Sequence, residues 1–175
     1  MGGLMVTDKR KKELWRAFKF LLFSASAGLI EFGSFTLLNE VKWFDFLDRL
    51  SSFQYLGTEY TWHYAFCYLI ALILSVLWNF TFNRRFTFKS ANNINIAMLK
   101  VFVFYLFFTP ASTLITYLLA DQMGLNEYVV LIIVMISNLL LEFPYQRFFV
   151  FGKSLDTNAA AIKALENQET SISEN

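Results

Sequence analysis

Four stretches of the chain consist almost entirely of apolar residues over about 20 positions, the length of helix that crosses the ~30 Å hydrocarbon core of a bilayer. They lie near Phe18–Leu38, Trp62–Asn83, Met98–Leu119 and Tyr128–Phe149. A hydrophobic run of this length has no common counterpart in soluble proteins. The pattern therefore predicts an all-α integral membrane protein with four transmembrane helices, which form one domain over residues 18–152.

Polar sequence flanks this domain on both sides. Residues 1–17 contain most of the basic, amphipathic sequence KRKKELWRAFK, which is typical of a segment attracted to anionic lipid at the inner membrane surface. Residues 153–175 predict a polar cytoplasmic tail with one short helix near Ala159–Leu165. Between the first two spans, the long outer loop Asn39–Thr61 predicts either a short helix lying in the membrane interface or an aromatic belt.

Alternating aromatic and polar residues in Trp78–Ser90, WNFTFNRRFTFKS, allow two interpretations of the end of the second span. Read alone, the alternation is typical of a β-hairpin. A copy of its centre, FPYQRFFVF, lies 63 residues downstream at Phe143–Phe151. This copy carries Gln-Arg-Phe where a hairpin would need a turn such as Asn-Gly or Asp-Gly. We therefore predict a helix end followed by an aromatic segment at the interface.

The copied motif divides the chain into two tandem units of two spans each. A shorter match, KFLLF at Lys19 and KVFVF at Lys100, precedes the first and third spans. Because each unit has an even number of spans, both units would cross the membrane in the same orientation, related by an axis along the membrane normal.

The distribution of charge sets the expected orientation. Thirteen of the 15 Lys and Arg residues lie before the first span, between the second and third, or after the fourth. Only Lys42 and Arg49 lie in the other two connections. Because cytoplasmic loops of membrane proteins carry the excess of Lys and Arg, the bias predicts that both termini are inside (N-in, C-in).

Composition narrows the classes of function. At 56% hydrophobic and 17% charged residues, the chain has too few charges for an ordinary soluble domain, in which about 25% of residues are charged. One Cys (Cys67) and one His (His63) exclude a disulfide framework and a His/Cys metal cluster. The sequence resembles no nucleotide-binding loop and no Ser/His/Asp arrangement. We therefore expect a non-enzymatic membrane protein that uses no cofactor, metal or nucleic acid.

Polar residues inside the spans line up on helix faces. In the second and fourth spans they recur at i, i+4 and i+8, at equivalent places of the two copies: Ser75, Asn79 and Asn83, and Asn138, Glu142 and Gln146. The first and third spans carry faces of small polar residues and one glutamate: Ser24, Gly28 and Glu31, and Thr109, Ser112, Thr113 and Thr116. A polar face is unstable in lipid unless it turns to a partner or a water-filled cavity. We therefore predict a bundle with a polar interior that opens inward near Arg84 and Arg147.

Two carboxylates in the spans are candidate functional groups. Glu31 lies about a dozen residues into its span, where a charge costs at least ~3 kcal/mol. By default such a group is a proton, ion or substrate site, and the alternative is a structural hydrogen bond between helices. Glu142 lies nearer the cytoplasmic end, where we expect either a substrate role or an ion pair with Arg147 or Arg84.

Arg84 and Arg147 occupy equivalent places of the two copies, at the depth of lipid headgroups. The planar guanidinium binds phosphate through two parallel hydrogen bonds, so the pair is a candidate phosphate site. The alternative is that each arginine only anchors the topology. Anchoring is the role we assign to Arg85, because Phe148 takes its place in the second copy.

NFTFNRRFTF, at the inner end of the second of four spans, resembles the GtrA-like family of small bacterial membrane proteins. The family pattern, similar to Asn-Phe-x-x-Asn-Arg-x-Phe-x-Phe, is matched by Asn79, Phe80, Asn83, Arg84, Phe86 and Phe88. Glu31 takes the place of an acidic residue that the family tends to carry in its first span. The resemblance covers about residues 15–152.

This resemblance implies a role in the lipid-linked sugar pathways of the bacterial cytoplasmic (inner) membrane. Members are thought to move a polyprenyl-phosphate monosaccharide from the inner to the outer leaflet. A glycosyltransferase then uses it there to decorate O-antigen, teichoic acid or another surface glycan. Some members have instead been proposed to recruit or anchor such a transferase.

The residue pattern assigns a place to each part of such a lipid. The phosphate would bind Arg84 and Arg147, and the prenyl chain would stay in lipid, entering between helices. The sugar would follow a polar path toward Glu31 that consists of Ser75, Asn79, Asn83, Asn138, Glu142 and Gln146.

Two other functions stay open. A scaffold that recruits a glycosyltransferase would transport nothing and would tolerate loss of the Glu31 carboxylate. A proton-coupled exporter of cationic drugs, similar to the small multidrug-resistance family, is disfavoured by the charge bias, the long outer loop and the paired arginines. Four short spans make a thin bundle, for which a homodimer is expected.

Overall fold

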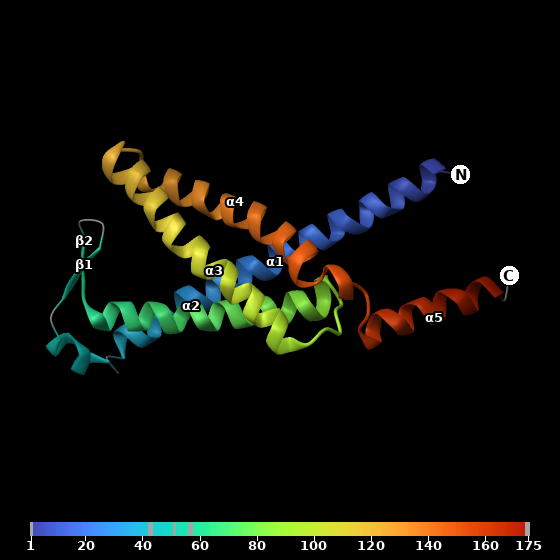
Figure 1. Ribbon diagram of the computed structural model, residues 1–175, viewed down its shortest axis with the longest axis horizontal. Helices are drawn as coiled ribbons and strands as arrows, with labels where there is room; N and C mark the ends of the chain where they lie inside the picture. Colours follow the sequence, from blue (N-terminus) through green and yellow to red (C-terminus); the bar gives the residue numbers. More distant parts are fainter. Residues whose placement is uncertain (1, 42–43, 51, 56–57, 174–175) are drawn as a thin grey trace.

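The computed structural model describes residues 2–41, 44–50, 52–55 and 58–173 (Figure 1). Lys42 and Trp43 of the outer loop lie outside the described residues. The helices are α1 (Gly2–Glu40), α2 (Trp62–Phe82), α3 (Ile94–Thr116), α4 (Glu127–Tyr145) and α5 (Ala159–Ser173). A short 3₁₀ helix (Asp45–Arg49) and the antiparallel strands β1 (Phe53–Tyr55) and β2 (Thr58–Tyr60) fill the loop between α1 and α2.

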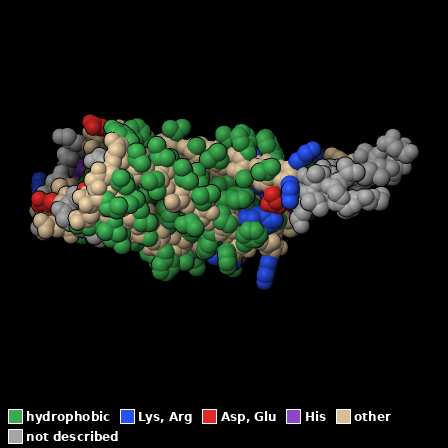
Figure 2. Space-filling view, turned by 90° about the horizontal axis from the view of Figure 1, so that it is seen from above, with side chains coloured by type: hydrophobic (Ala, Val, Ile, Leu, Met, Phe, Trp, Pro, Cys, Tyr) green, Lys and Arg blue, Asp and Glu red, His purple; other side chains and the backbone are tan. Residues whose placement is uncertain are grey.

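Four helices of the described chain are long and apolar enough to cross a membrane: Arg10–Glu40, Trp62–Thr87, Ile94–Gln122 and Tyr128–Val150. Each contains one of the four stretches identified from the sequence. The prediction of an all-α membrane protein with four transmembrane helices is therefore confirmed. Hydrophobic side chains cover the body of the molecule, and Lys and Arg gather at one end of it (Figure 2). We call this end the inner end, after the predicted N-in, C-in orientation. The orientation itself stays a prediction.

The helices form two antiparallel pairs. α1 and α2 lie side by side, and α3 and α4 form the second pair (Figure 1). The pairs meet at the inner end, and their outer ends diverge (Figure 1). The start of α1 and the end of α5 both lie at the inner end, as an even number of spans requires.

The segments flanking the spans are more regular than expected. The basic N-terminal segment and the first span share one continuous helix, α1, so the boundary proposed at residue 17 falls inside a helix. The helix predicted near Ala159–Leu165 exists and continues to Ser173 as α5. In the outer loop the strand pair β1–β2, with Phe53 opposite Tyr60, had no counterpart in the sequence analysis.

Both copies of the motif end their span in the same way. After α2 and after α4 the chain makes a five-residue π turn, Asn83–Thr87 and Gln146–Val150. Each turn closes on an equivalent hydrogen bond, from Phe88 N–H to the Asn83 carbonyl and from Phe151 N–H to the Gln146 carbonyl, both at 2.9 Å. The helical interpretation of Trp78–Ser90 is thus correct, and the hairpin interpretation is wrong.

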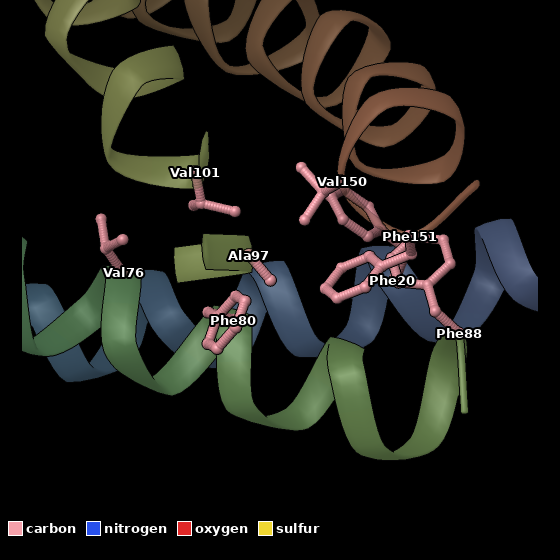
Figure 3. Close-up of a cluster of buried hydrophobic side chains, with 8 residues drawn as sticks. All are labelled: Phe20, Val76, Phe80, Phe88, Ala97, Val101, Val150 and Phe151. Atoms are coloured by element: carbon pink, nitrogen blue, oxygen red, sulfur yellow. The ribbon is translucent and has the colours of Figure 1, made fainter. Parts of the chain in front are cut away.

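The aromatic residues of the two copies form the core at the inner end. Phe88 and Phe151, both fully buried, stack with their ring centroids 4.8 Å apart (Figure 3). The remaining members of this cluster are Phe20, Val76, Phe80, Ala97, Val101 and Val150. Without a strong hydrophobic drive between helices in lipid, close packing of this kind holds them together.

A pair of lysine contacts repeats between the units. Lys19 Nζ donates to the Phe86 carbonyl at 2.7 Å, and Lys100 Nζ donates to the Phe149 carbonyl at 3.0 Å. These residues are the ones that the sequence matches between the first and second units. The contacts are those that two related units would make, and the tandem repeat stays an interpretation.

Truncation of the central stacked ring should destabilise the protein. We expect Phe88→Ala to lower the free energy of unfolding by ~3 kcal/mol, because it leaves a cavity in a packed core. Phe107→Ala is the matched control, since Phe107 is 72% exposed on the outside of the bundle. Thermal unfolding in detergent measures the difference, and equal losses in the two variants would contradict the role assigned to the stack.

Candidate functional site

Glu142 is the centre of a buried hydrogen-bond network. Glu142 is 1% exposed, and it is the only buried acidic residue among the described residues. Four neutral donors from α2, α3, α4 and the π turn after α4 surround it: Asn79 Nδ2 (3.0 Å), Tyr105 OH (3.0 Å) and Gln146 Nε2 (2.9 Å) on Oε1, and Asn138 Nδ2 (3.5 Å) on Oε2. Burial of an ionised group is costly unless hydrogen bonds compensate for the lost water. These donors provide that compensation without a cation.

The ion pair considered for Glu142 is not formed. Arg147 donates instead to Glu13, from Nε and Nη2, both at 3.0 Å. Arg84 donates to Asn92, from Nε to Oδ1 at 3.3 Å and from Nη2 to the carbonyl at 2.7 Å. Glu142 is therefore held by neutral groups and remains separate from both arginines in the described contacts.

A directed chain of hydrogen bonds leads from the inner end of α2 to Glu142. Thr87 Oγ1 donates to Asn83 Oδ1 (2.8 Å), Asn83 Nδ2 to Asn79 Oδ1 (2.6 Å), and Asn79 Nδ2 to Glu142 Oε1 (3.0 Å). The helical spacing of four residues places these side chains on one face. Asn79 also accepts from Ser24 Oγ of α1 at 3.3 Å. The polar stripe of α2 is thus buried between helices, and its role in binding stays a prediction.

The network borders a cavity of about 270 Å³ inside the span region. We call it the interior cavity. Its polar lining comes from all four spans: Ser24, Glu31, Ser75, Asn79, Tyr105, Asn138 and Glu142. Asn83 and Gln146, both fully buried, lie beyond this lining on the side of the inner end. Five of the seven residues predicted for the polar path and its carboxylates therefore line one cavity, and the other two, Asn83 and Gln146, lie next to this lining.

Glu31 meets the second span at Ser75. Ser75 Oγ lies 2.9 Å from Glu31 Oε2 and 3.1 Å from the Leu72 carbonyl. A hydroxyl carries one hydrogen, so it donates to only one of these two acceptors at a time. If Glu31 is protonated it can donate to Ser75 while Ser75 donates to Leu72. The site therefore accommodates both the charged and the neutral form of Glu31.

Two amide oxygens of the network have no donor among the described residues. They are Asn138 Oδ1 and Gln146 Oε1, both buried. Each belongs to a side chain whose amino group is already committed to Glu142. A buried acceptor without a donor is costly, and Asn138 lines the interior cavity. A ligand with hydroxyl groups would supply the missing donor there.

The polar face predicted for the third span does not take part. Ser112, Thr113 and Thr116 each donate to a carbonyl of their own helix at 2.9 Å. Because hydroxyls can satisfy themselves on the preceding turn, they need not face a polar interior. The expectation of four inward polar faces was wrong for α3, which contributes Tyr105 instead. Tyr105 could not be singled out from the sequence, because it lies in the aromatic run FYLFF.

A network of ion pairs joins α1 to the segment before α5 at the inner end, and the sequence did not predict it. Arg16 of α1 is only 5% exposed and donates to Glu13 and to Asp156, which lies between α4 and α5. Lys12 pairs with Asp156 at 2.7 Å. Burial would raise the pKa of Asp156, but the hydrogen bonds from Lys12 and Arg16 hold it below its ordinary value. The sequence placed these residues only in charge clusters, because their partners lie far apart along the chain.

Arg84 and Arg147 do not meet in the described contacts. Arg84 lines a cavity of about 510 Å³ at the inner end between α2 and α3, together with Arg85, and Arg147 is not part of that lining. Each arginine has a different partner, as described above. Their assignment to a common phosphate site stays a prediction, and Arg147 would have to exchange Glu13 for the phosphate.

The fold and the interior cavity define a small multi-pass membrane protein with a polar site inside its helix bundle. The family model described as GtrA/DPMS, transmembrane domain, matches residues 19–151. The chain belongs to this family, and is thus a membrane protein of polyprenyl-phosphate sugar processes. Comparison with curated proteins and with solved structures found no match.

Acidification should release the segment around Asp156 from the inner end. Because the folded-state pKa of Asp156 is lowered, its carboxylate stabilises the contact above the unfolded-state pKa of about 3.9. This contribution is lost as the pH falls through the folded-state pKa. We expect protection factors for hydrogen exchange at the Asp156 and Thr157 amides, which bond to the Phe88 and Lys89 carbonyls, to fall at acid pH.

Asp156→Asn provides the control. It should show reduced protection already at neutral pH and should lose the dependence on acid pH. Equal protection of these amides in both proteins at neutral and at acid pH would contradict the assignment.

Proposed function

We propose that this protein moves a polyprenyl-phosphate-linked monosaccharide from the inner to the outer leaflet of the bacterial cytoplasmic membrane, for modification of a cell-surface glycan. The observation that carries the proposal is the interior cavity, a hydrogen-bonding site lined by residues of four apolar spans. The proposed activity is transport, and the chain's own residues carry out no bond-forming chemistry.

The barrier to such movement is the polar sugar. A hydroxyl transferred from water to hydrocarbon without a partner costs about 4–8 kcal/mol. The interior cavity offers acceptors at Glu31, Glu142 and the unpaired Asn138 Oδ1, and the hydroxyl oxygens of Ser75 and Tyr105 can accept as well. Its volume of about 270 Å³ lies near the lower end of small-molecule sites, which measure about 300–1,000 Å³. A single sugar ring suits these dimensions better than an oligosaccharide.

The other parts of the lipid fit the surroundings of the cavity. The prenyl chain would remain in the bilayer, alongside the exposed apolar faces of the spans. The phosphate would stay near the inner-end arginines. Arg147 already holds a carboxylate through two parallel hydrogen bonds, and a phosphate accepts the same geometry. Use of the lipid at the outer surface, or an ion bound at Glu31, would give the movement its direction.

A scaffold role is the second candidate, and α5 is the feature that favours it. This helix lies outside the span region and leaves Ile162 and Leu165 about half exposed. An apolar stripe on a helix beyond the membrane domain is typical of a docking surface for a partner. The partner would be a glycosyltransferase that uses the same lipid, and the protein would then transport nothing itself.

Purified protein in liposomes separates the two functions. A lipid-linked sugar with a radioactive sugar ring, which adds no bulk to the substrate, is oxidised by an impermeant reagent such as periodate only in the outer leaflet. Transport is measured as the loss of the protected fraction. A transporter exposes this fraction over time, whereas a scaffold leaves it protected.

Changes to the cavity should slow this movement. We expect Asn79→Leu and Glu31→Gln each to reduce the rate at least tenfold, because the first removes the amide that bonds to Glu142, Asn83 and Ser24 and the second replaces a carboxylate of the cavity lining with an amide. Thr116→Val is the matched control, because Thr116 is exposed and bonds only to its own helix in the described contacts. Wild-type rates in the two cavity variants would remove the cavity from the transport path.

A further inference from the structure

The α2–α3 interface contains a site that the interior cavity does not use. At its inner end lies the cavity of about 510 Å³ lined by Thr81, Arg84, Arg85, Ser90 and Asn158, among others, which we call the seam pocket. None of the described residues that line it is acidic. Farther out between the same two helices lies a trough of about 490 Å³, the apolar groove, whose lining includes Leu72, Val76, Leu99, Val103 and Leu106.

The seam pocket has a positive electrostatic character from two sources. Arg84 and Arg85 contribute full charges. In addition, α3 begins at Ile94 and α5 begins at Ala159, and both residues line the pocket. The positive end of a helix dipole favours an anion. Two arginine side chains and two helix N-termini thus contribute positive charge to one cavity.

The arginines of the pocket are available to a ligand to different degrees. Arg84 is fixed by its two hydrogen bonds to Asn92, which leaves Nη1 to bind a ligand. Arg85 lies 5.3 Å from the centre of the Phe86 ring, and within the described chain its guanidinium has no hydrogen bond or ion pair. An exposed arginine held by a ring keeps its planar fork of donors open. Arg147, by contrast, is already paired with Glu13.

The apolar groove continues the seam pocket along the same helices. Phe80 lines the pocket and Val76, one turn farther out on α2, lines the groove. On α3 the adjacent residues Met98 and Leu99 divide in the same way. The groove is open to lipid, since Leu99 and Leu106 are 64% and 69% exposed. Its lining extends outward to Leu69 of α2 and Pro110 of α3.

A cationic pocket at headgroup depth that leads into a single apolar trough suits one class of molecule. We propose that the α2–α3 interface binds a polyprenyl phosphate, with its phosphate on Arg84 and Arg85 and its chain in the apolar groove. This inference rests on the proposed function for the class of lipid. It assigns the phosphate to two arginines of the first copy and gives Arg85 a binding role in place of anchoring.

Native mass spectrometry of the full-length protein in detergent tests the proposal by titration with a polyprenyl phosphate. The matched probes are the prenol of the same chain length, inorganic phosphate and phosphatidylglycerol. We expect tight binding of the prenyl phosphate and at least tenfold weaker binding of each of the other three. Equal binding of the prenol would show that the phosphate is not recognised, and equal binding of inorganic phosphate or phosphatidylglycerol would overturn the assigned lipid.

Two variants locate the site. Arg84→Gln combined with Arg85→Gln should weaken binding at least tenfold, and Val103→Trp, which fills the groove from an exposed position, should weaken it several-fold. Lys153→Gln, which removes an exposed inner charge, and Val129→Trp on the exposed face of α4 are the controls and should change it less than twofold. Unchanged binding in the double arginine variant would overturn the inference. An unfolding temperature equal to that of the wild type shows that weakened binding in this variant is not caused by misfolding.

Failure of this inference differs from failure of the proposed function. Movement in liposomes together with unchanged binding in the double arginine variant would overturn the seam site alone. Arginine-dependent binding by a protein that moves no lipid would leave the seam site intact and would overturn transport.

Discussion

The hydrogen bonds that converge on Glu142 join three of the four spans. Asn79 reaches this carboxylate from α2 and Tyr105 from α3, while Asn138 is part of the same helix, α4. Within a bilayer, apolar contact between helices has little advantage over contact with lipid, so packing and internal hydrogen bonds must hold the bundle. A buried carboxylate also demands its donors, because no water replaces them. The arrangement of the spans around the interior cavity therefore depends on keeping this one group satisfied.

The rest of the architecture separates a packed inner end from a divergent outer end. The stacked pair Phe88 and Phe151 brings the two motif copies together, and the lysine contacts to the π turns lie at the same level. Toward the outer end the pairs diverge, and the apolar groove opens between α2 and α3. Aromatic residues of the motif thus build the core, while its amides line the path to Glu142. One short sequence serves both packing and polarity because the helix places its residues on different faces.

The spans and two of their polar faces could be predicted from the pattern of apolar and polar residues along the chain. The four spans follow from length, and the stripes of α2 and α4 follow from a spacing of four residues, which is a local property of a helix. Contacts between distant residues could not be predicted in the same way. Arg147 pairs with Glu13, 134 positions away, and Tyr105 reaches Glu142 from an aromatic run. The polar face of the third span does not predict a polar interior, because hydroxyl side chains can bond to their own backbone. The β1–β2 pair could not be predicted, because strands of three residues are too short to show a clear alternation of polar and apolar residues.

The unbroken course of α1 has a mechanical consequence. Its 39 residues extend about 58 Å at 1.5 Å per residue, nearly twice the ~30 Å hydrocarbon thickness. Glu13 and Glu31 are 18 residues, or about five turns, apart on this rod, and therefore face the same side. A ligand that took Arg147 away from Glu13 would remove one of the contacts that hold the inner part of this rigid helix, whose outer part carries Glu31; Lys12 and Arg16 would still join it to Asp156. Events at the headgroup level and deep in the bilayer would then be linked by rigid-body movement of a single helix.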